Sequence, residues 1–113
     1  MYKVSFYTPK NKNSPISDFL DSCNENLRAK IGQQLKYAEQ FGLTTAIPNL
    51  KKVLTTPLWE LRILGKDNVR IFCINLPGRE VKVLHIFKKK KQKTPQKEIS
   101  IALNRINNLT IDI

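Results

Sequence analysis

The sequence PLWELRILGKDNVRIFCINLPGREVKVLHIFKK, residues 57–89, decides the fold, because it contains three runs rich in β-branched and aromatic residues. These runs are Pro57–Leu64, Val69–Asn75 and Val81–Lys89. Turn-forming residues separate them, with Gly65–Asn68 in the first gap and Leu76–Arg79 in the second. Short turns between successive strands predict an antiparallel meander.

Two helices are predicted before the meander. Ser14 followed by Pro15 is typical of a helix start, because the hydroxyl caps free N–H groups and proline fits the first turn. A second helix is expected to begin near Asn24 and to end at Gly42. Each helix has a single apolar stripe and therefore needs a sheet face to cover. The stripes are Ile16, Phe19, Leu20 and Cys23, then Leu27, Ile31, Leu35, Ala38 and Phe41.

The remaining elements complete one domain over residues 1–113, a usual domain length. Tyr2–Tyr7 alternates like a strand, and Leu50–Leu54 is a short strand. Thr94-Pro95 repeats the helix-start pattern before a last helix. Its stripe is Ile99, Ala102, Leu103, Ile106 and Leu109. The order β-α-α-β-β-β-β-α predicts an α+β fold with the helices against one face of an antiparallel sheet.

Positive charge is concentrated in one part of the chain. The net charge is +11, of which residues 51–97 carry +10, residues 1–50 carry +2 and residues 98–113 carry −1. A one-sided basic excess is typical of a protein that binds a polyanion such as RNA, although a basic surface that only aids solubility is the simpler alternative.

Nothing in the sequence predicts export or a membrane anchor. The two cysteines, Cys23 and Cys73, lack metal-ligand spacing and lie in apolar patterns, which predicts free thiols in a reducing compartment. No segment has the roughly 18 apolar residues of a membrane span, and Met1–Lys10 lacks the apolar stretch of a signal peptide. We therefore expect a cytoplasmic protein without membrane contact.

The turns also predict which side chains share a sheet face. A tight turn around Lys66 sets Arg62 opposite Arg70, and a turn centred on Pro77-Gly78 sets residue 70 opposite 85 and 72 opposite 83. One face, expected under the helices, then collects Trp59, Leu61, Ile63, Val69, Ile71, Cys73, Leu84 and Ile86. The other collects Glu60, Arg62, Arg70, Phe72, Val83, His85 and Phe87. A loop with an odd number of residues would move His85 to the opposite face.

Two opposed arginines repel each other, so this pairing indicates a site for a phosphate or a carboxylate. The alternative is that Glu60 forms an ordinary surface ion pair with Arg62 or Arg70. Five lysines, at positions 88–91 and 93, lie between the last strand and the expected helix start, which holds them near the arginines. We expect these lysines to bind phosphates and to serve in proton transfer, with the N–H groups of the helix start as a further anion site.

Four motifs resemble one family when read in order: Leu58–Arg62, Val69–Phe72, Leu84–Lys89 and Gln92–Pro95. They are similar to those of the RelE/HigB-type toxins of bacterial toxin–antitoxin systems, in particular the phage-derived HigB-like branch, and the likeness spans residues 2 to 109. The resemblance implies two helices packed on a curved antiparallel sheet. It also implies ribosome-dependent cleavage of messenger RNA without metal or cofactor, and silencing by a helix-turn-helix (HigA-like) antitoxin.

The resemblance suggests a role for each polar residue of the site. Cleavage needs a base for the ribose 2′-OH, cations for the developing phosphorane charge and an acid for the 5′-oxygen. The predicted catalytic residues are Arg62, Arg70, Lys88, Lys90, Lys93 and His85. Predicted RNA contacts are Lys89, Lys91, Phe72 and Phe87, with core packing as the alternative for the two phenylalanines. Glu60 is expected to orient Arg62, and most of the lysines are expected to dock on ribosomal RNA.

Two other functions remain open at this point. A ParE-type relative would share the fold but poison gyrase without a nuclease site. A non-catalytic RNA- or ribosome-binding module would use the same basic surface without cleaving its ligand.

Overall fold

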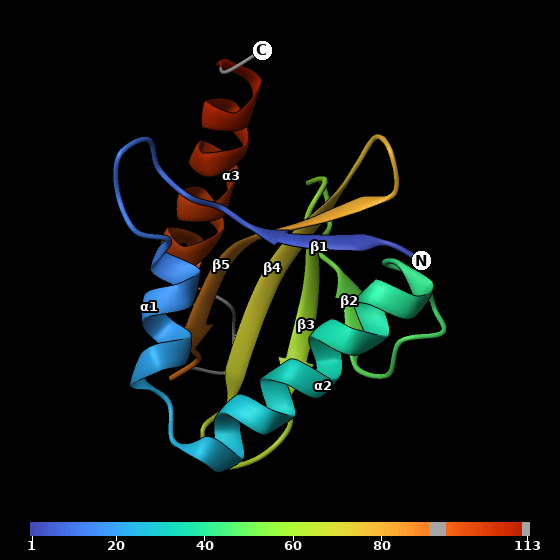
Figure 1. Ribbon diagram of the computed structural model, residues 1–113, viewed down its shortest axis with the longest axis vertical. Helices are drawn as coiled ribbons and strands as arrows, with labels where there is room; N and C mark the ends of the chain where they lie inside the picture. Colours follow the sequence, from blue (N-terminus) through green and yellow to red (C-terminus); the bar gives the residue numbers. More distant parts are fainter. Residues whose placement is uncertain (91–94, 112–113) are drawn as a thin grey trace.

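A five-stranded sheet in the order β1-β5-β4-β3-β2 organises the structure, a computed structural model that describes residues 1–90 and 95–111 (Figure 1). The strands are β1 Lys3–Phe6, β2 Leu50–Lys52, β3 Trp59–Ile63, β4 Val69–Leu76 and β5 Glu80–Lys88. The helices are α1 Pro15–Ser22, α2 Glu25–Phe41 and α3 Gln96–Ile111. The predicted order of elements is confirmed.

The first two helices begin where the sequence predicts. The Ser14 side chain accepts a hydrogen bond from the backbone N–H of Ile16 at 3.2 Å, and the Asn24 side chain accepts one from Leu27 at 2.8 Å. Each cap satisfies a donor that the first helical turn leaves free. The expected cap of the last helix, Thr94, lies outside the described residues.

The sheet is mixed, so the prediction of an antiparallel sheet is wrong at one edge. β1 pairs with β5 in parallel, with Lys3 next to Glu80 and Phe6 next to Val83. Alternation predicts a strand but not the direction of its partner, and two helices and three strands separate these strands along the chain. The Ser5 hydroxyl donates to the Glu80 carboxylate across the pair and lowers the pKa of that carboxyl.

Helices cover both faces of the sheet, whereas the sequence pattern placed them on one. α1 and α2 pack on one face, and α3 packs on the other. The strand residues under α1 and α2 include Leu61, Ile63, Val69, Ile71, Cys73, Val83 and Ile86. Those under α3 are Phe72, Ile74, Leu84 and Phe87, joined by Leu58 just before β3, and they meet the predicted stripe of the last helix. β4 and β5 are therefore buried from two sides.

The β4–β5 pairing differs from the expected register in two ways that cancel for His85. Leu76 pairs with Glu80, which leaves a loop of three residues, 77–79, and such a loop by itself would turn His85 to the other face. A β-bulge at Phe72/Cys73 shifts the pairing back, so Phe72 lies opposite His85 and Cys73 opposite Val83.

The loop and the bulge together correct three details of the predicted pairing and faces. Arg70 lies opposite Phe87 instead of His85. Val83 faces α1 and α2, and Leu84 faces α3, the reverse of the prediction. The three-residue loop alone reverses the faces of Val83 and Leu84, and the bulge then moves the partner of Arg70 one residue further, to Phe87.

Both cysteines are free thiols, as predicted. Cys73 is fully buried, and this burial raises the pKa of its thiol to about 12. None of the described helices is long and apolar enough to cross a membrane.

Substitution of Gly42, which ends α2, and of Gly32, inside α2, should change the stability of the fold in opposite directions. Gly42 has φ 69° and ψ −172°, and an added Cβ would lie 2.6 Å from the Tyr2 ring, so Gly42→Ala should destabilise the fold by roughly 1–3 kcal/mol or more. Gly32 lies inside the helix with nothing within 4 Å of an added Cβ, so Gly32→Ala should stabilise it by roughly 0.5–1 kcal/mol. Urea unfolding measures both changes, and equal effects of the two substitutions would contradict this packing.

Candidate functional site

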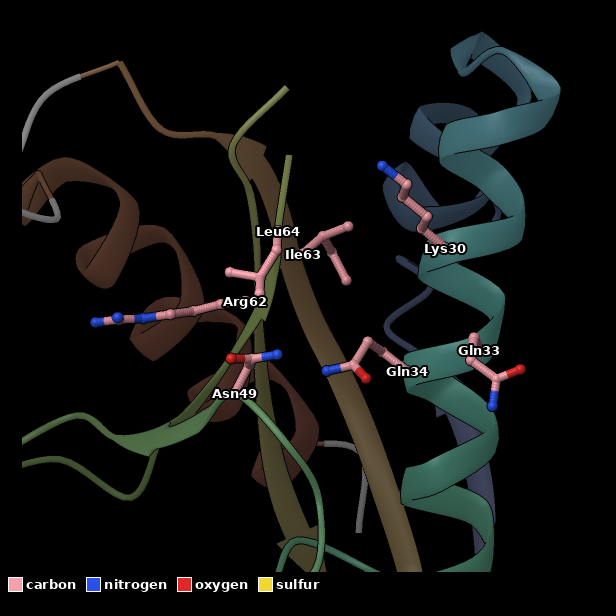
Figure 2. Close-up of a pocket in the computed structure, with 7 residues that line it drawn as sticks. All are labelled: Lys30, Gln33, Gln34, Asn49, Arg62, Ile63 and Leu64. Carbon is pink, nitrogen blue, oxygen red and sulfur yellow. The ribbon is translucent and has the colours of Figure 1, made fainter. Parts of the chain in front are cut away.

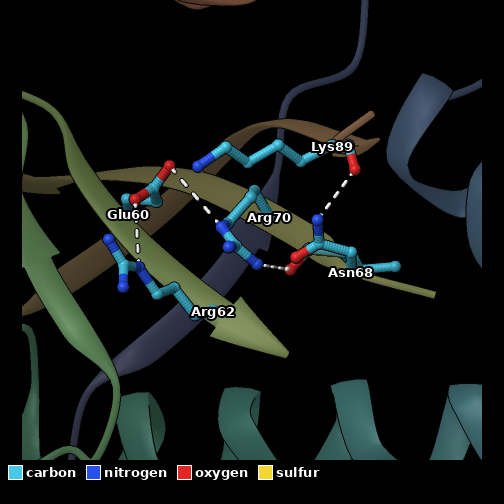
Figure 3. Close-up of polar contacts among 6 residues, drawn as sticks. Glu60, Arg62, Asn68, Arg70 and Lys89 are labelled. Atoms are coloured by element: carbon cyan, nitrogen blue, oxygen red, sulfur yellow. Dashed lines mark hydrogen bonds and ion pairs between the residues drawn. The ribbon is translucent and has the colours of Figure 1, made fainter. Parts of the chain in front are cut away.

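The pairing of β3 with β4 brings the two predicted arginines together. Arg62 lies directly opposite Arg70, as the tight turn between the strands predicts. Glu60, two residues before Arg62 and on the same face, lies between them (Figure 3). Its Oε1 is 3.5 Å from Nε of Arg62, and its Oε2 is 4.0 Å from Nε of Arg70. We call these three residues the arginine clamp.

The carboxylate of the clamp is buried, so it is not the surface ion pair that the sequence left as an alternative. Glu60 is 4% exposed and Arg70 is 8% exposed. Burial lowers the pKa of the Arg70 guanidinium, Glu60 raises it, and the nearby Arg62 lowers it further. A buried carboxylate thus offsets part of the repulsion between two cations.

Several guanidinium nitrogens of the clamp have no hydrogen-bond partner in the part of the chain that the structure describes. Within residues 1–90 and 95–111, the Arg62 side chain makes one hydrogen bond, from Nε to Glu60, and its side chain is 36% exposed. Nη1 of Arg70 donates to the carbonyl of Val69 at 3.3 Å, while Nε of Arg70 is buried without a hydrogen bond to the described residues. Two guanidinium groups that share one carboxylate retain donors for a second anion.

Lys89 adds a third cation to the clamp. Asn68, in the β3–β4 turn at φ 51°, donates from its side chain to the carbonyl of Lys89 at 2.8 Å. The backbone N–H of Lys89 donates back to the carbonyl of Asn68 at 2.9 Å. These two bonds fix the end of β5 against the turn, and Figure 3 shows the Lys89 side chain extending back across β4 toward Glu60.

Lys88 and Lys90, the other lysines of the run that the structure describes, lie away from the clamp. The Lys88 side chain is 53% exposed and lies 3.8 Å from Asp67, and strand alternation puts it on the face opposite Lys89. Lys90 is exposed beyond the end of β5. Lys91 and Lys93 lie outside the described residues. Of the three described lysines, 88–90, the geometry thus joins Lys89 to the arginines, although the sequence assigned it only to RNA contact.

His85 lies on the clamp's face of the sheet, in a polar network under α3. Its Nε2 is 2.7 Å from Oε1 of Glu98, and its Nδ1 is 3.3 Å from Nη1 of Arg105, which also donates to the carbonyl of Leu84 at 2.7 Å. A carboxylate only accepts, so Nε2 carries the proton and Nδ1 accepts from Arg105. Burial lowers the pKa of His85, and the bond to Glu98 raises it in part.

This network ties α3 to the sheet and uses both nitrogens of His85. The Arg105 guanidinium lies 5.1 Å from the Tyr7 ring, and Asn108 donates to the Tyr7 hydroxyl at 3.1 Å. With neither ring nitrogen free to accept a proton from a ligand, His85 has the geometry of a positioning residue. Its predicted role as a base stays a prediction.

The two predicted stacking residues lie in the core beneath α3. Phe72 is 0% exposed, and its ring centroid is 5.3 Å from that of Phe87. Phe87 in turn stacks on His85 at 5.3 Å. Neither ring is open to an RNA base in this structure, and core packing, the alternative from the sequence, describes both.

Sequence reasoning missed three residues of this region: Asn68, Glu98 and Arg105. Glu98, Ala102 and Arg105 follow the spacing of one helix face, a pattern that points two charged groups at the sheet. The sequence does not predict that α3 covers the sheet face that carries His85. Taken alone, therefore, this pattern indicates only an ordinary solvated helix surface. Asn68 gives only the signal of a turn residue with positive φ.

Comparisons with known proteins define the class of fold first. The structure is similar to a double arginine-to-alanine mutant of the E. coli toxin RelE in the free state, with a TM-score of 0.66 and 16% sequence identity, over 93% of this chain and 97% of that chain. At that identity the likeness concerns the fold alone. No curated protein matches the chain.

The family model of the phage-derived Gp49-like proteins (DUF891) matches residues 18–107. The chain therefore belongs to this family. The predicted relation to the RelE-type fold and to its phage-derived branch is confirmed.

The His85 network predicts a dependence of stability on pH. The folded state holds the pKa of His85 below its ordinary 6.5, so below about pH 6.5 the unfolded chain binds more protons and stability falls as the pH falls. His85→Gln removes this contribution. The difference in unfolding free energy between wild type and variant should therefore change between pH 7 and pH 5, by at most about 1.4 kcal/mol per pH unit. A difference that is constant over this range in urea titrations would contradict the assignment.

Proposed function

We propose that this chain is the toxin of a type II toxin–antitoxin system and that it acts as a ribosome-dependent messenger RNA endoribonuclease, an mRNA interferase. The arginine clamp is the observation that carries the proposal. Two opposed guanidinium groups around one buried carboxylate suit a phosphate diester, and Lys89 adds a third cation beside them. Membership of the Gp49-like family and the fold of the toxin RelE agree with it.

The proposed reaction is cleavage of the RNA chain by its own ribose. The 2′-oxygen loses its proton and attacks the adjacent phosphorus, and the bond from phosphorus to the 5′-oxygen breaks. The leaving 5′-oxygen takes up a proton, so the products are a 2′,3′-cyclic phosphate and a 5′-hydroxyl. Negative charge builds up on the phosphorane oxygens, where preorganised cations lower the barrier most.

Arg62 and Arg70 supply these cations in our proposal. The exposed Nη atoms of Arg62 bind one non-bridging oxygen, and the more buried Arg70 binds the other. Glu60 is a positioning residue, because its carboxylate holds Nε of Arg62 and so aims the rest of the guanidinium outward. With this division of roles, chemistry depends on both arginines without a metal ion.

Lys89 is our candidate for proton transfer to the 5′-oxygen or for a third phosphate contact. Asn68 fixes its backbone, and its side chain extends toward the clamp. Lys88 and Lys90 are more exposed and better suited to neighbouring phosphates of the RNA or of the ribosome. For Lys91 and Lys93 the proposed roles rest on the sequence motif alone.

The proposed partners follow from the proposed activity. The ribosome presents messenger RNA to the clamp, and ribosomal RNA attracts the basic segment of residues 51–97. A helix-turn-helix (HigA-like) antitoxin holds the protein inactive until it is needed. Both partners belong to the cytoplasm.

Substitution of the clamp should abolish growth arrest. Arg62→Ala keeps the buried pair of Glu60 and Arg70, and Arg70→Lys keeps a buried cation, so both variants should fold. We expect cleavage of messenger RNA, mapped by primer extension after induction, to fall by roughly 10²–10³-fold, while ribosome association persists. Lys36→Ala, an exposed lysine of α2, is the control and should remain toxic.

The same experiment separates the other functions. DNA damage without codon-linked cuts by the wild-type protein would favour gyrase poisoning. Loss of ribosome binding in step with the lost charge would favour a non-catalytic binding module. Full toxicity of both clamp variants would contradict the proposed site.

A further inference from the structure

A cavity of about 230 Å³ opens between α2 and the end of β3 (Figure 2). β2 pairs with β3 only as far as Leu61, so the segment from Arg62 to Leu64 forms an open sheet edge at the cavity. Ile63 extends from this edge toward α2, whereas the guanidinium of Arg62 leaves on the opposite side. Arg62 is one of the lining residues, and its guanidinium belongs to the clamp, so one residue joins both sites.

Hydrogen bonds and one close contact fix the residues that line the cavity opposite Ile63 and Leu64. Gln34 is 8% exposed, and its Nε2 donates to the carbonyl of Pro48 at 2.9 Å. Asn49 follows with φ 62°, and its carbonyl accepts the backbone N–H of Arg62 at 3.0 Å. Lys30 reaches across from α2, so that its Nζ would lie 3.1 Å from a Cβ at Gly65.

The lining has the chemistry of a site for a flat, largely apolar ligand with a polar edge and a negative charge nearby. Among the described residues it consists of the cation of Lys30, three residues with side-chain amides, two aliphatic residues and Arg62, whose guanidinium points away, and it includes no carboxylate. Side-chain amides both donate and accept, as base edges do. Pockets for drug-sized ligands measure roughly 300–1,000 Å³, so this smaller cavity suits a fragment the size of one nucleobase.

We propose that this cavity, which we call the β3-edge cavity, binds the base of a nucleotide next to the phosphate that Arg62 and Arg70 hold. Asn49 contacts the base edge, Ile63 and Leu64 lie against its face, and Lys30 meets the flanking phosphate. The inference rests on the proposed function, since it makes the cavity the place where the RNA sequence beside the cut is read.

A peptide strand fits the cavity less well than a nucleotide. Addition of a strand to a sheet edge depends on free backbone groups, and the N–H of Arg62 already bonds to Asn49. The open edge extends over three residues, 62–64, which is short for a stable pairing. The cation of Lys30 and the shared Arg62 favour an RNA strand that passes around the edge.

The first arm of the test measures base preference at the cut. Asn49→Gly removes the amide and retains the positive φ of this position, and Lys30→Gln removes the cation from α2. We expect Asn49→Gly to relax the preference at one position beside the cut by about fivefold or more, as loss of a base-edge contact does. Lys36→Gln is the matched control on α2. An unchanged distribution of cuts would overturn the inference, and a wild-type protein that makes no cuts would overturn the proposed function instead.

The second arm measures binding without catalysis. The side-chain NH₂ signals of Gln33, Gln34 and Asn49 are followed by NMR during titration of the full chain with each of the four nucleoside monophosphates. We expect shifts that differ between bases, that weaken in Lys30→Gln and that inorganic phosphate alone does not produce. Identical shifts with inorganic phosphate, or shifts with an acidic peptide and none with nucleotides, would overturn the inference whatever the result of the cleavage assay.

Discussion

The carboxylate of Glu60 is the group on which the arrangement of the site depends. Register alone sets Arg62 opposite Arg70, and two like charges at this spacing repel. The carboxylate oxygens of Glu60 lie 3.5 Å from Nε of Arg62 and 4.0 Å from Nε of Arg70. Glu60 and Arg70 are buried, whereas the Arg62 side chain is partly exposed to solvent. Removal of one member of such a group leaves an uncompensated buried charge, which typically costs about 3–5 kcal/mol. The same arrangement holds the guanidinium groups ready for a second anion.

The short tight turn explains why the central pair could be predicted from sequence. Gly65–Asn68 leaves little freedom in the β3–β4 register, so the position of Arg62 against Arg70 follows from counting. Helix starts at Ser14 and Asn24 were equally local, because a capping side chain acts within three residues. Such constraints depend only on residues close together in the sequence, so the sequence predicts them.

Features that depend on contacts between distant parts of the chain could not be predicted from neighbouring residues. His85 reaches its predicted face because an odd loop and a β-bulge cancel each other, and neither is specified by alternation. The parallel pairing of β1 with β5 and the position of α3 on the second face depend on contacts between distant parts of the chain. The choice of Lys89 over Lys88 depends on Asn68, which is 21 residues away.

A double-mutant cycle on unfolding free energy tests the central claim that Glu60 holds the arginine clamp together. Glu60→Gln and Arg70→Met, measured singly and together by urea unfolding, should be coupled by roughly 1–3 kcal/mol, because the second change relieves the charge that the first leaves unpaired. Glu60→Gln combined with Arg28→Met, whose side chain bonds carbonyls near the end of α1, should be additive. Additivity of the Glu60 and Arg70 changes within about 0.5 kcal/mol would contradict the account.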